Sequence, residues 1–213
     1  GELSDFCQKS DTLTLSLLRE KLEGGLNNDN DLIRGNLSGE VDDDTTLLHY
    51  VCYNRHVTLD IVQYLVSLYP EAVEVVTDYG WLPLHRACNN LTCPDNVVEY
   101  LISLYPEALS VSWPPRGLPL HCLFSRRIRD REYVLSKSKE VQYPLNLNLV
   151  RKLVEAYPEA LINQDNSSTM SPLMCAVGRE DVSLDLVRLL VDPELSVLGM
   201  GGGYNRGDIP FTA

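Results

Sequence analysis

An eight-residue segment that occurs three times constrains the fold of this chain more than any other feature. Residues 65–72 read LVSLYPEA, residues 101–108 read LISLYPEA 36 positions later, and residues 153–160 read LVEAYPEA. A second motif keeps the same step, because LPLH at residues 82–85 returns at residues 118–121. A chain with this period folds as a stack of small units, each of which buries its apolar side against its neighbours.

Each unit contains the signals for two helices separated by a short loop. Pro83 fits the first turn of a helix, where its missing amide has no intrahelical partner. Asp95 can cap a second helix, in which apolar residues such as Val98 and Leu101 recur at helical spacing. Pro106 ends that helix. The sequence therefore predicts an all-α solenoid of stacked helix–turn–helix units.

The repeats divide the chain into two expected regions. Residues 1–41 are predicted to hold an N-terminal capping helix or decayed repeat, over residues 11–22, and an acidic loop. Residues 42–213 form the repeat domain, with units at about 42–77, 78–113, 114–166 and 167–204, and a partial fifth unit at 205–213. Because the fifth unit stops within its first helix, we expect the natural protein to continue past Ala213.

The third unit contains a basic insertion of about 16 extra residues within 125–146. Its basic side chains include four arginines, Arg126, Arg127, Arg129 and Arg131. A longer loop costs little closure entropy, so one interpretation is a tolerated insertion that is dispensable for folding. The other is a docking element, because loops carry binding functions disproportionately often.

Charge and cysteine content narrow the possible partners and compartments. The net charge of −12 argues against nucleic-acid binding. A membrane span needs about 20 consecutive apolar residues, and the sequence has no such stretch. Cysteines such as Cys52 and Cys88 share a repeat position, which predicts buried thiols and a reducing, cytoplasmic compartment. Three glycosylation triplets, at Asn36, Asn90 and Asn166, point the other way, and we interpret them as coincidences.

No motif predicts catalysis or a cofactor. The spacing of His49 with Cys52 and of His85 with Cys88 places both side chains on one helical face, but a zinc site needs four converging ligands. A phosphate-binding loop and a dinucleotide fingerprint are both absent. We therefore expect no enzyme activity, no cofactor, no metal and no small-molecule substrate in this chain.

The repeated motifs resemble those of ankyrin repeats. The ankyrin pattern of an Asp and Gly turn, T-P-L-H-x-A and a second helix with V-x-x-L-L is matched by the following residues: Asp78, Gly80, Pro83, Leu84, His85, Ala87, Val98, Leu101 and Ile102. The resemblance covers about residues 42–213 and implies that the motif histidine makes a structural hydrogen bond. The chain departs from the pattern in its 36-residue period, in Tyr-Pro-Glu-Ala after the second helix, and in Leu82 and Leu118 at the usual threonine position.

The resemblance implies a non-enzymatic module or scaffold that binds a protein on a concave face and at loop tips. The expected loop-tip residues are Tyr79, Trp81, Trp113 and Arg116, and the expected first-helix residues are Tyr50, Tyr53, Asn54, Arg86 and Asn89. Two alternatives stay open: an accessory subunit of a larger assembly, and the targeting region of a longer enzyme. The sequence leaves open the partner's identity, the organelle, the oligomeric state, and a removed leader before Gly1.

Overall fold

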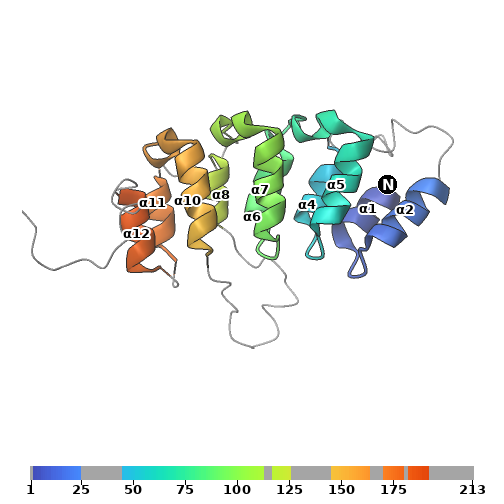
Figure 1. The fold of residues 1–213 in the computed structure, drawn as a ribbon, viewed down its shortest axis with the longest axis horizontal. Helices are drawn as coiled ribbons and strands as arrows, with labels where there is room; N and C mark the ends of the chain where they lie inside the picture. The colour runs from blue at the N-terminus through green and yellow to red at the C-terminus, as the bar shows by residue number, and fades with distance from the viewer. Residues whose placement is uncertain are drawn as a thin grey trace, which may run out of the picture.

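The molecule is a row of helix pairs, which stand side by side in chain order (Figure 1). The computed structural model describes residues 2–24, 45–112, 117–125, 145–163, 170–179 and 182–191. The first helices of the pairs are α1 (Glu2–Lys9), α4 (Leu47–Tyr53), α6 (Pro83–Asn89), α8 (Pro119–Phe124) and α11 (Pro172–Val177). The second helices are α2 (Leu15–Gly24), α5 (Leu59–Leu68), α7 (Asp95–Leu104), α10 (Leu147–Ala156) and α12 (Leu184–Val191). The predicted all-α solenoid is confirmed.

The pairs form two layers around one continuous core. In one layer α1, α4, α6, α8 and α11 pack in succession, and in the other α2 packs on α5, α5 on α7, and α10 on α12. Figure 1 shows α5, α7 and α10 in the layer nearer the viewer. A single cluster of buried apolar side chains runs from Leu3 to Leu190. Among the described residues, no helix is both long enough and apolar enough to cross a membrane.

The N-terminal region holds two helices where the sequence predicted one. α2 overlaps the helix expected over residues 11–22, and α1 precedes it. α1 packs against α4, and α2 packs against α5, as later pairs pack on their neighbours. α1 escaped prediction because it is only eight residues long and buries few apolar side chains, chiefly Leu3 and Cys7.

A short 3-10 turn follows the second helix in three units, and the repeated Tyr-Pro-Glu-Ala sequence explains it. The turns are η1 (Pro70–Val73), η2 (Pro106–Ser110) and η3 (Pro158–Leu161). The tyrosine before each proline leaves the helical conformation, with ψ of 83° at Tyr69 and 78° at Tyr105, because proline disfavours helix for the residue before it. In η1, Ala72 is buried and Glu71 is exposed. Each turn therefore directs a carboxylate outward.

Two asparagines that are 36 residues apart, Asn54 and Asn90, each tie their own unit to the one before it. Asn54 Nδ2 donates to the carbonyl oxygens of Cys7 (3.0 Å) and Ser10 (3.1 Å). Asn90 Nδ2 donates to the carbonyl oxygens of Cys52 (3.0 Å) and Asn54 (2.8 Å). Both side chains are buried. The glycosylation triplet at Asn90 is thus coincidental, because its amide nitrogen is committed to the core; Asn36 and Asn166 lie outside the described residues.

We expect Asn90→Ala to destabilise the fold by about 1–3 kcal/mol, because two buried carbonyl groups lose their donor. The matched control is Asn89→Ala, which removes the adjacent, half-buried amide and should change stability by less than about 0.5 kcal/mol. Urea unfolding followed by circular dichroism measures both variants. Equal unfolding midpoints for the two variants would contradict a structural role of Asn90.

Candidate functional site

The motif histidines His49, His85 and His121 each close the start of their own helix, and His49 and His85 also contact the loop that follows the second helix of their pair. His49 Nδ1 accepts from the amide of Thr46 (3.2 Å), and His85 Nδ1 accepts from the amide of Leu82 (3.2 Å). His49 Nε2 lies 3.2 Å from the carbonyl oxygen of Trp81, and His85 Nε2 lies 3.0 Å from that of Val111. Because Nδ1 accepts, the proton is on Nε2, which donates to the loop that leads toward the next first helix.

These contacts explain why leucine can replace the usual threonine. In the first unit the Thr46 hydroxyl lies 2.9 Å from His49 Nδ1. In the third unit, which has Leu118, the backbone amide of Leu118 still donates to His121 Nδ1 (3.3 Å). In all three units the backbone amide therefore donates the hydrogen bond to Nδ1 of the histidine. The hydroxyl of Thr46 adds a second contact to Nδ1 in the first unit only. The structural role that the resemblance implied for the histidine fits this geometry.

Burial keeps the histidines uncharged at neutral pH. Desolvation lowers the pKa of His49 to about 3 and that of His85 to about 4, although the bonds to backbone carbonyls act in the opposite direction. A charged imidazole at these positions would cost more than its hydrogen bond returns. The histidines are therefore neutral structural groups.

A five-residue turn, residues 77–81, connects the second helix of one unit to the first helix of the next. Gly80 N donates to the carbonyl oxygen of Thr77 (2.7 Å), and Thr77 N donates to that of Trp81 (2.9 Å). Trp81 N also donates to the hydroxyl of Thr77 (3.1 Å). Gly80 has a φ of 83°, a left-handed conformation that favours glycine. The closed turn holds Tyr79 outward, with 63% of its surface exposed.

Trp81 is buried, so the expectation of an exposed loop-tip anchor is wrong for this residue. Only 8% of its surface is exposed, and it belongs to the apolar core. Its ring meets the ring of His85 edge-on, with centroids 6.4 Å apart and an interplanar angle of 87°. The sequence suggested exposure because Trp81 adjoins a turn, but the turn folds back and places the indole against the first helix.

Arg86 lies over two aromatic rings from different units. Its guanidinium carbon is 4.2 Å from the centroid of the Trp81 ring and 5.5 Å from the centroid of the Tyr53 ring. Contacts of this kind contribute about 0.5–2 kcal/mol. Arg86 and Tyr53 are both half-buried. The pair of rings therefore holds the guanidinium at the surface of the first-helix layer and restricts its rotamers.

The remaining predicted site residues divide by burial. Tyr50 and Asn89 are half-buried on the first helices, and Tyr50 packs against the core. Asn54 is only 1% exposed and its amide bonds the preceding unit, so the expectation that it faces a partner is wrong. The following predicted residues lie outside the described part of the chain: Trp113, Arg116, Arg126, Arg127, Arg129 and Arg131.

The cysteines are free thiols that pack as small apolar side chains. Five of the six are buried, and Cys175 is half-buried. Desolvation raises the pKa of Cys7 to about 12 and raises the pKa of Cys52 and Cys122 well above the usual value. A thiol that stays protonated is a poor nucleophile and metal ligand. Within the residues that the structure describes, no three His, Cys, Asp or Glu side chains are placed to hold a metal ion.

Comparison with known families agrees with this geometry. The family model of ankyrin repeats, in three copies, matches residues 10–110. The same pattern continues beyond the match, because α8 begins with the histidine contact of the earlier units. A search of curated proteins finds no match to the chain.

The stability of the protein should fall as the pH is lowered from 7 to 5. In this range unfolded histidine, with a pKa of about 6.5, takes up protons while His49 and His85 stay neutral in the fold. The unfolded state then binds more protons, which costs the fold at most about 1.4 kcal/mol per pH unit for each histidine. The loss ends near pH 3–4, where the folded histidines also become protonated.

Urea unfolding at pH 7.5 and pH 5.0, on wild type and on His85→Gln, measures this dependence. The variant should be less stable than wild type at pH 7.5 but should lose less on acidification. The control is His56→Gln, which removes an exposed histidine, so that the effect of the buried ring can be told from the loss of any histidine. An unaltered pH slope in His85→Gln would refute the assignment.

We expect Trp81→Ala to destabilise the fold by about 3–5 kcal/mol, comparable to about 2–5 kcal/mol for the buried Leu84→Ala. Tyr79→Ala, two residues earlier in the same turn and exposed, should change stability by less than about 0.5 kcal/mol. Thermal melting of the three variants compares them. If Trp81→Ala melts like Tyr79→Ala, the indole does not belong to the core.

Proposed function

This chain belongs to the ankyrin-repeat family, and we propose that it binds a protein partner across its first helices and the turn at residues 77–81. Ankyrin repeats generally mediate protein–protein interaction and are typically non-catalytic. The support for the proposed site comes from three properties of this surface: its charge distribution, the restrained position of Arg86 and the rigidity of the turn.

Four of the five first helices, all except α1, are nearly uncharged, although the chain carries a net charge of −12. Among the four helices α4, α6, α8 and α11, Arg86 is the single side chain with a permanent charge. A weakly charged surface loses little solvation when a partner covers it. This favours a partner that brings apolar or aromatic groups and one acidic group for Arg86.

The contact of Arg86 with Trp81 and Tyr53 is the observation that carries the proposal. Ordering a free arginine side chain at an interface costs about 0.5–1.5 kcal/mol of conformational entropy. Here the two rings restrict the side chain before any partner arrives. Trp, Tyr and Arg are also the residues most enriched at interface hot spots. Trp81 thus supports the site from below and does not itself anchor the partner.

The turn at residues 77–81 adds an exposed aromatic side chain on a rigid base. Tyr79 is exposed, and the backbone around it is closed by the bonds between Thr77, Gly80 and Trp81. The bond from His49 to the Trp81 carbonyl fixes the turn to the preceding unit. A tyrosine on such a turn offers contact area at a low entropic cost. The proposed site therefore comprises Tyr50, Tyr53, Tyr79, Arg86 and Asn89.

We expect Arg86→Ala to weaken binding of the partner by about 2 kcal/mol or more, roughly 30-fold. Affinity capture from extracts of the source cells, quantified by mass spectrometry, compares wild type with the variant. The matched control is Arg19→Ala, because Arg19 lies 4.8 Å above the ring of Tyr64 in the second-helix layer. Each change removes one arginine that lies over aromatic side chains, two rings for Arg86 and one for Arg19, and both have the same effect on net charge.

The result expected is a set of proteins captured by wild type and by Arg19→Ala but lost with Arg86→Ala. Circular dichroism must show that Arg86→Ala remains folded under the capture conditions. If both variants capture the same proteins as wild type, the first-helix surface is not the binding site.

A further inference from the structure

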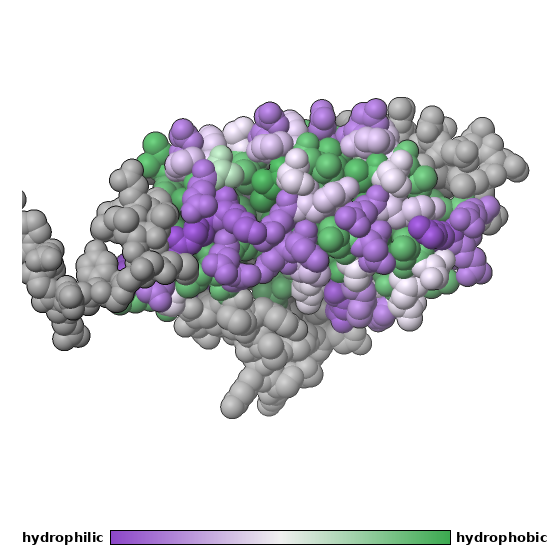
Figure 2. All heavy atoms as spheres, in the orientation of Figure 1, coloured by the Kyte–Doolittle hydropathy of each residue, from purple (hydrophilic) through white to green (hydrophobic). Residues whose placement is uncertain are grey.

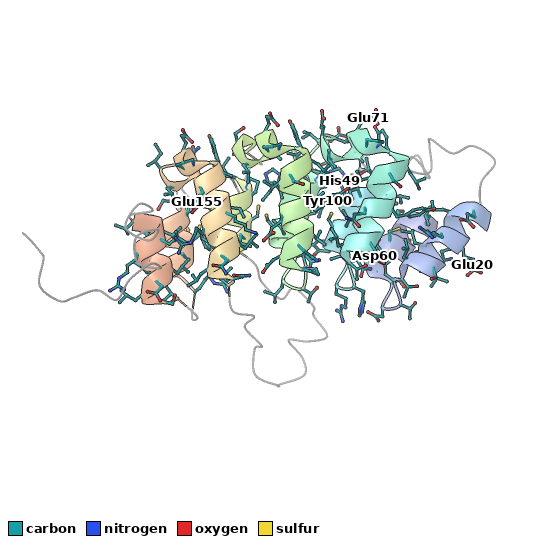
Figure 3. All side chains as sticks on the ribbon, in the orientation of Figure 1. Glu20, His49, Asp60, Glu71, Tyr100 and Glu155 are labelled. Atoms are coloured by element: carbon teal, nitrogen blue, oxygen red, sulfur yellow. The ribbon has the colours of Figure 1, made fainter. Side chains whose placement is uncertain are left out.

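The three 3-10 turns lie along one edge of the stack, here called the turn edge. It comprises η1, η2 and η3 with the adjoining ends of α5, α7 and α10, and it is the upper edge in Figure 1. Glu71 is labelled at this edge in Figure 3. Because η1, η2 and η3 all begin with Pro-Glu-Ala after a tyrosine of nearly the same backbone conformation, the edge presents one glutamate at each turn.

The turn edge is acidic and contains no basic residue. The segments 65–76, 100–112 and 153–163 hold five carboxylates and not one lysine, arginine or histidine. Glu99, in the middle of α7, forms an ion pair with Lys152 (2.7 Å) and is not counted in this row. The glutamates of the three turns, Glu71, Glu107 and Glu159, are exposed, and so is Glu74. A row of like charges attracts a cationic partner and raises its rate of association.

The same edge exposes large apolar side chains. Leu68, Val76, Leu104 and Ile162 are exposed by 43%, 42%, 41% and 84%. Apart from the last described unit, α11 and α12, the only other exposed large apolar side chain among the described residues is Tyr79. Figure 2 shows hydrophobic residues gathered below this edge, with hydrophilic side chains above them. Exposed apolar groups that cluster in this way mark interaction surfaces.

The spacing of these groups matches a helix. Leu68 and Leu104 are 36 residues apart and so occupy the same position in neighbouring units. Packed helices lie about 8–10 Å apart, a distance that an α-helix covers in roughly seven residues, or two turns. A helix running along the edge would therefore place equivalent side chains against successive units.

From this combination we propose that the turn edge binds a basic amphipathic helix of a partner protein. The apolar face of that helix contacts Leu68, Leu104 and Ile162, and its lysines and arginines meet Glu71, Glu107 and Glu159. Other occupants fit less well. An anionic membrane repels the edge, and a second copy in the same orientation opposes carboxylate to carboxylate. Glutamates about 10 Å apart are too distant to share a calcium ion, whose ligands lie at about 2.4 Å.

The turn edge differs from the site proposed on the first helices, so an experiment can contradict either proposal without contradicting the other. Arg86 lies on α6, whereas Leu68 and Leu104 end α5 and α7. A variant of one surface should therefore leave binding at the other unchanged.

The probe is a synthetic amphipathic helix of leucine, lysine and alanine, about three heptads or roughly 30 Å long. Fluorescence anisotropy measures its binding to the full 213-residue chain. A scrambled peptide of the same composition, with leucines distributed around the helix, tests whether the apolar face matters. A third peptide with glutamate in place of lysine tests the sign of the charge. The expected result is binding of the first peptide only, with an affinity that falls as salt is added.

The triple variant Glu71→Gln/Glu107→Gln/Glu159→Gln should weaken binding of this peptide about tenfold, because three exposed ion pairs are lost. The matched control is Glu20→Gln/Glu23→Gln/Asp185→Asn, which removes three exposed carboxylates from α2 and α12. This control should bind within about twofold of wild type. Leu68→Ser/Leu104→Ser should also weaken binding, and Arg86→Ala should not.

Three results would overturn the proposal. Equal binding of the scrambled peptide, or an equal loss in both triple variants, would show attraction to overall negative charge alone. Sedimentation of wild type as a dimer that the edge variants dissociate would show that a second copy occupies the edge. A thermal melting curve of each variant must show that it is folded at the temperature of the binding assay, so that a loss of affinity is not caused by unfolding.

Discussion

The stack depends on an imidazole that is buried, neutral and bonded at both nitrogens. Nδ1 of His85 closes the start of its own helix, and Nε2 reaches the carbonyl oxygen of Val111 in the following loop. One side chain thus joins the start of the first helix to the loop that leads to the next unit, and the equivalent bond of His49 reaches Trp81 in the next unit. The joint works only while the ring is neutral, because burial penalises its charged form. Helices of six to ten residues are marginal alone, so their stability comes from these contacts with neighbouring units.

The proposed binding surfaces are consequences of that scaffold. His49 bonds the carbonyl oxygen of Trp81, which anchors the turn that carries Tyr79 and places the indole beneath Arg86. The turn edge depends on a different feature, the proline that follows α5, α7 and α10 and is itself followed by an exposed glutamate. Two faces of contrasting character result. One is formed by the first helices α4, α6, α8 and α11, whose single permanent charge is Arg86. The other is an edge that carries carboxylates beside exposed leucines.

Sequence reasoning succeeded where a pattern repeats and failed where the answer depended on which way a side chain turns. The recurrence of LPLH and Tyr-Pro-Glu-Ala predicted the helix pairs, their boundaries at proline and the buried cysteines. Trp81 and Asn54 were both expected at a binding surface, and both are buried. The residue 36 positions later indicated a structural role for only one of them. Asn54 is followed by a second asparagine at position 90, as expected for a structural residue, whereas the position equivalent to Trp81, position 117, is glycine. The clue in Asn54 was available and was missed.

By itself the sequence determined the all-α solenoid, because a period of 36 residues with proline at fixed positions permits few other folds. It also determined the acidity of the chain and the lack of basic residues around the three turns. Only the tertiary structure decided which of the repeated polar groups are buried and which are presented. Burial depends on how each unit packs against the preceding one. The side-chain amide of Asn90 is therefore buried and hydrogen-bonded between two units, whereas Arg86 lies at the surface over two aromatic rings. Such contacts join residues of different units, and no local pattern in the sequence records them.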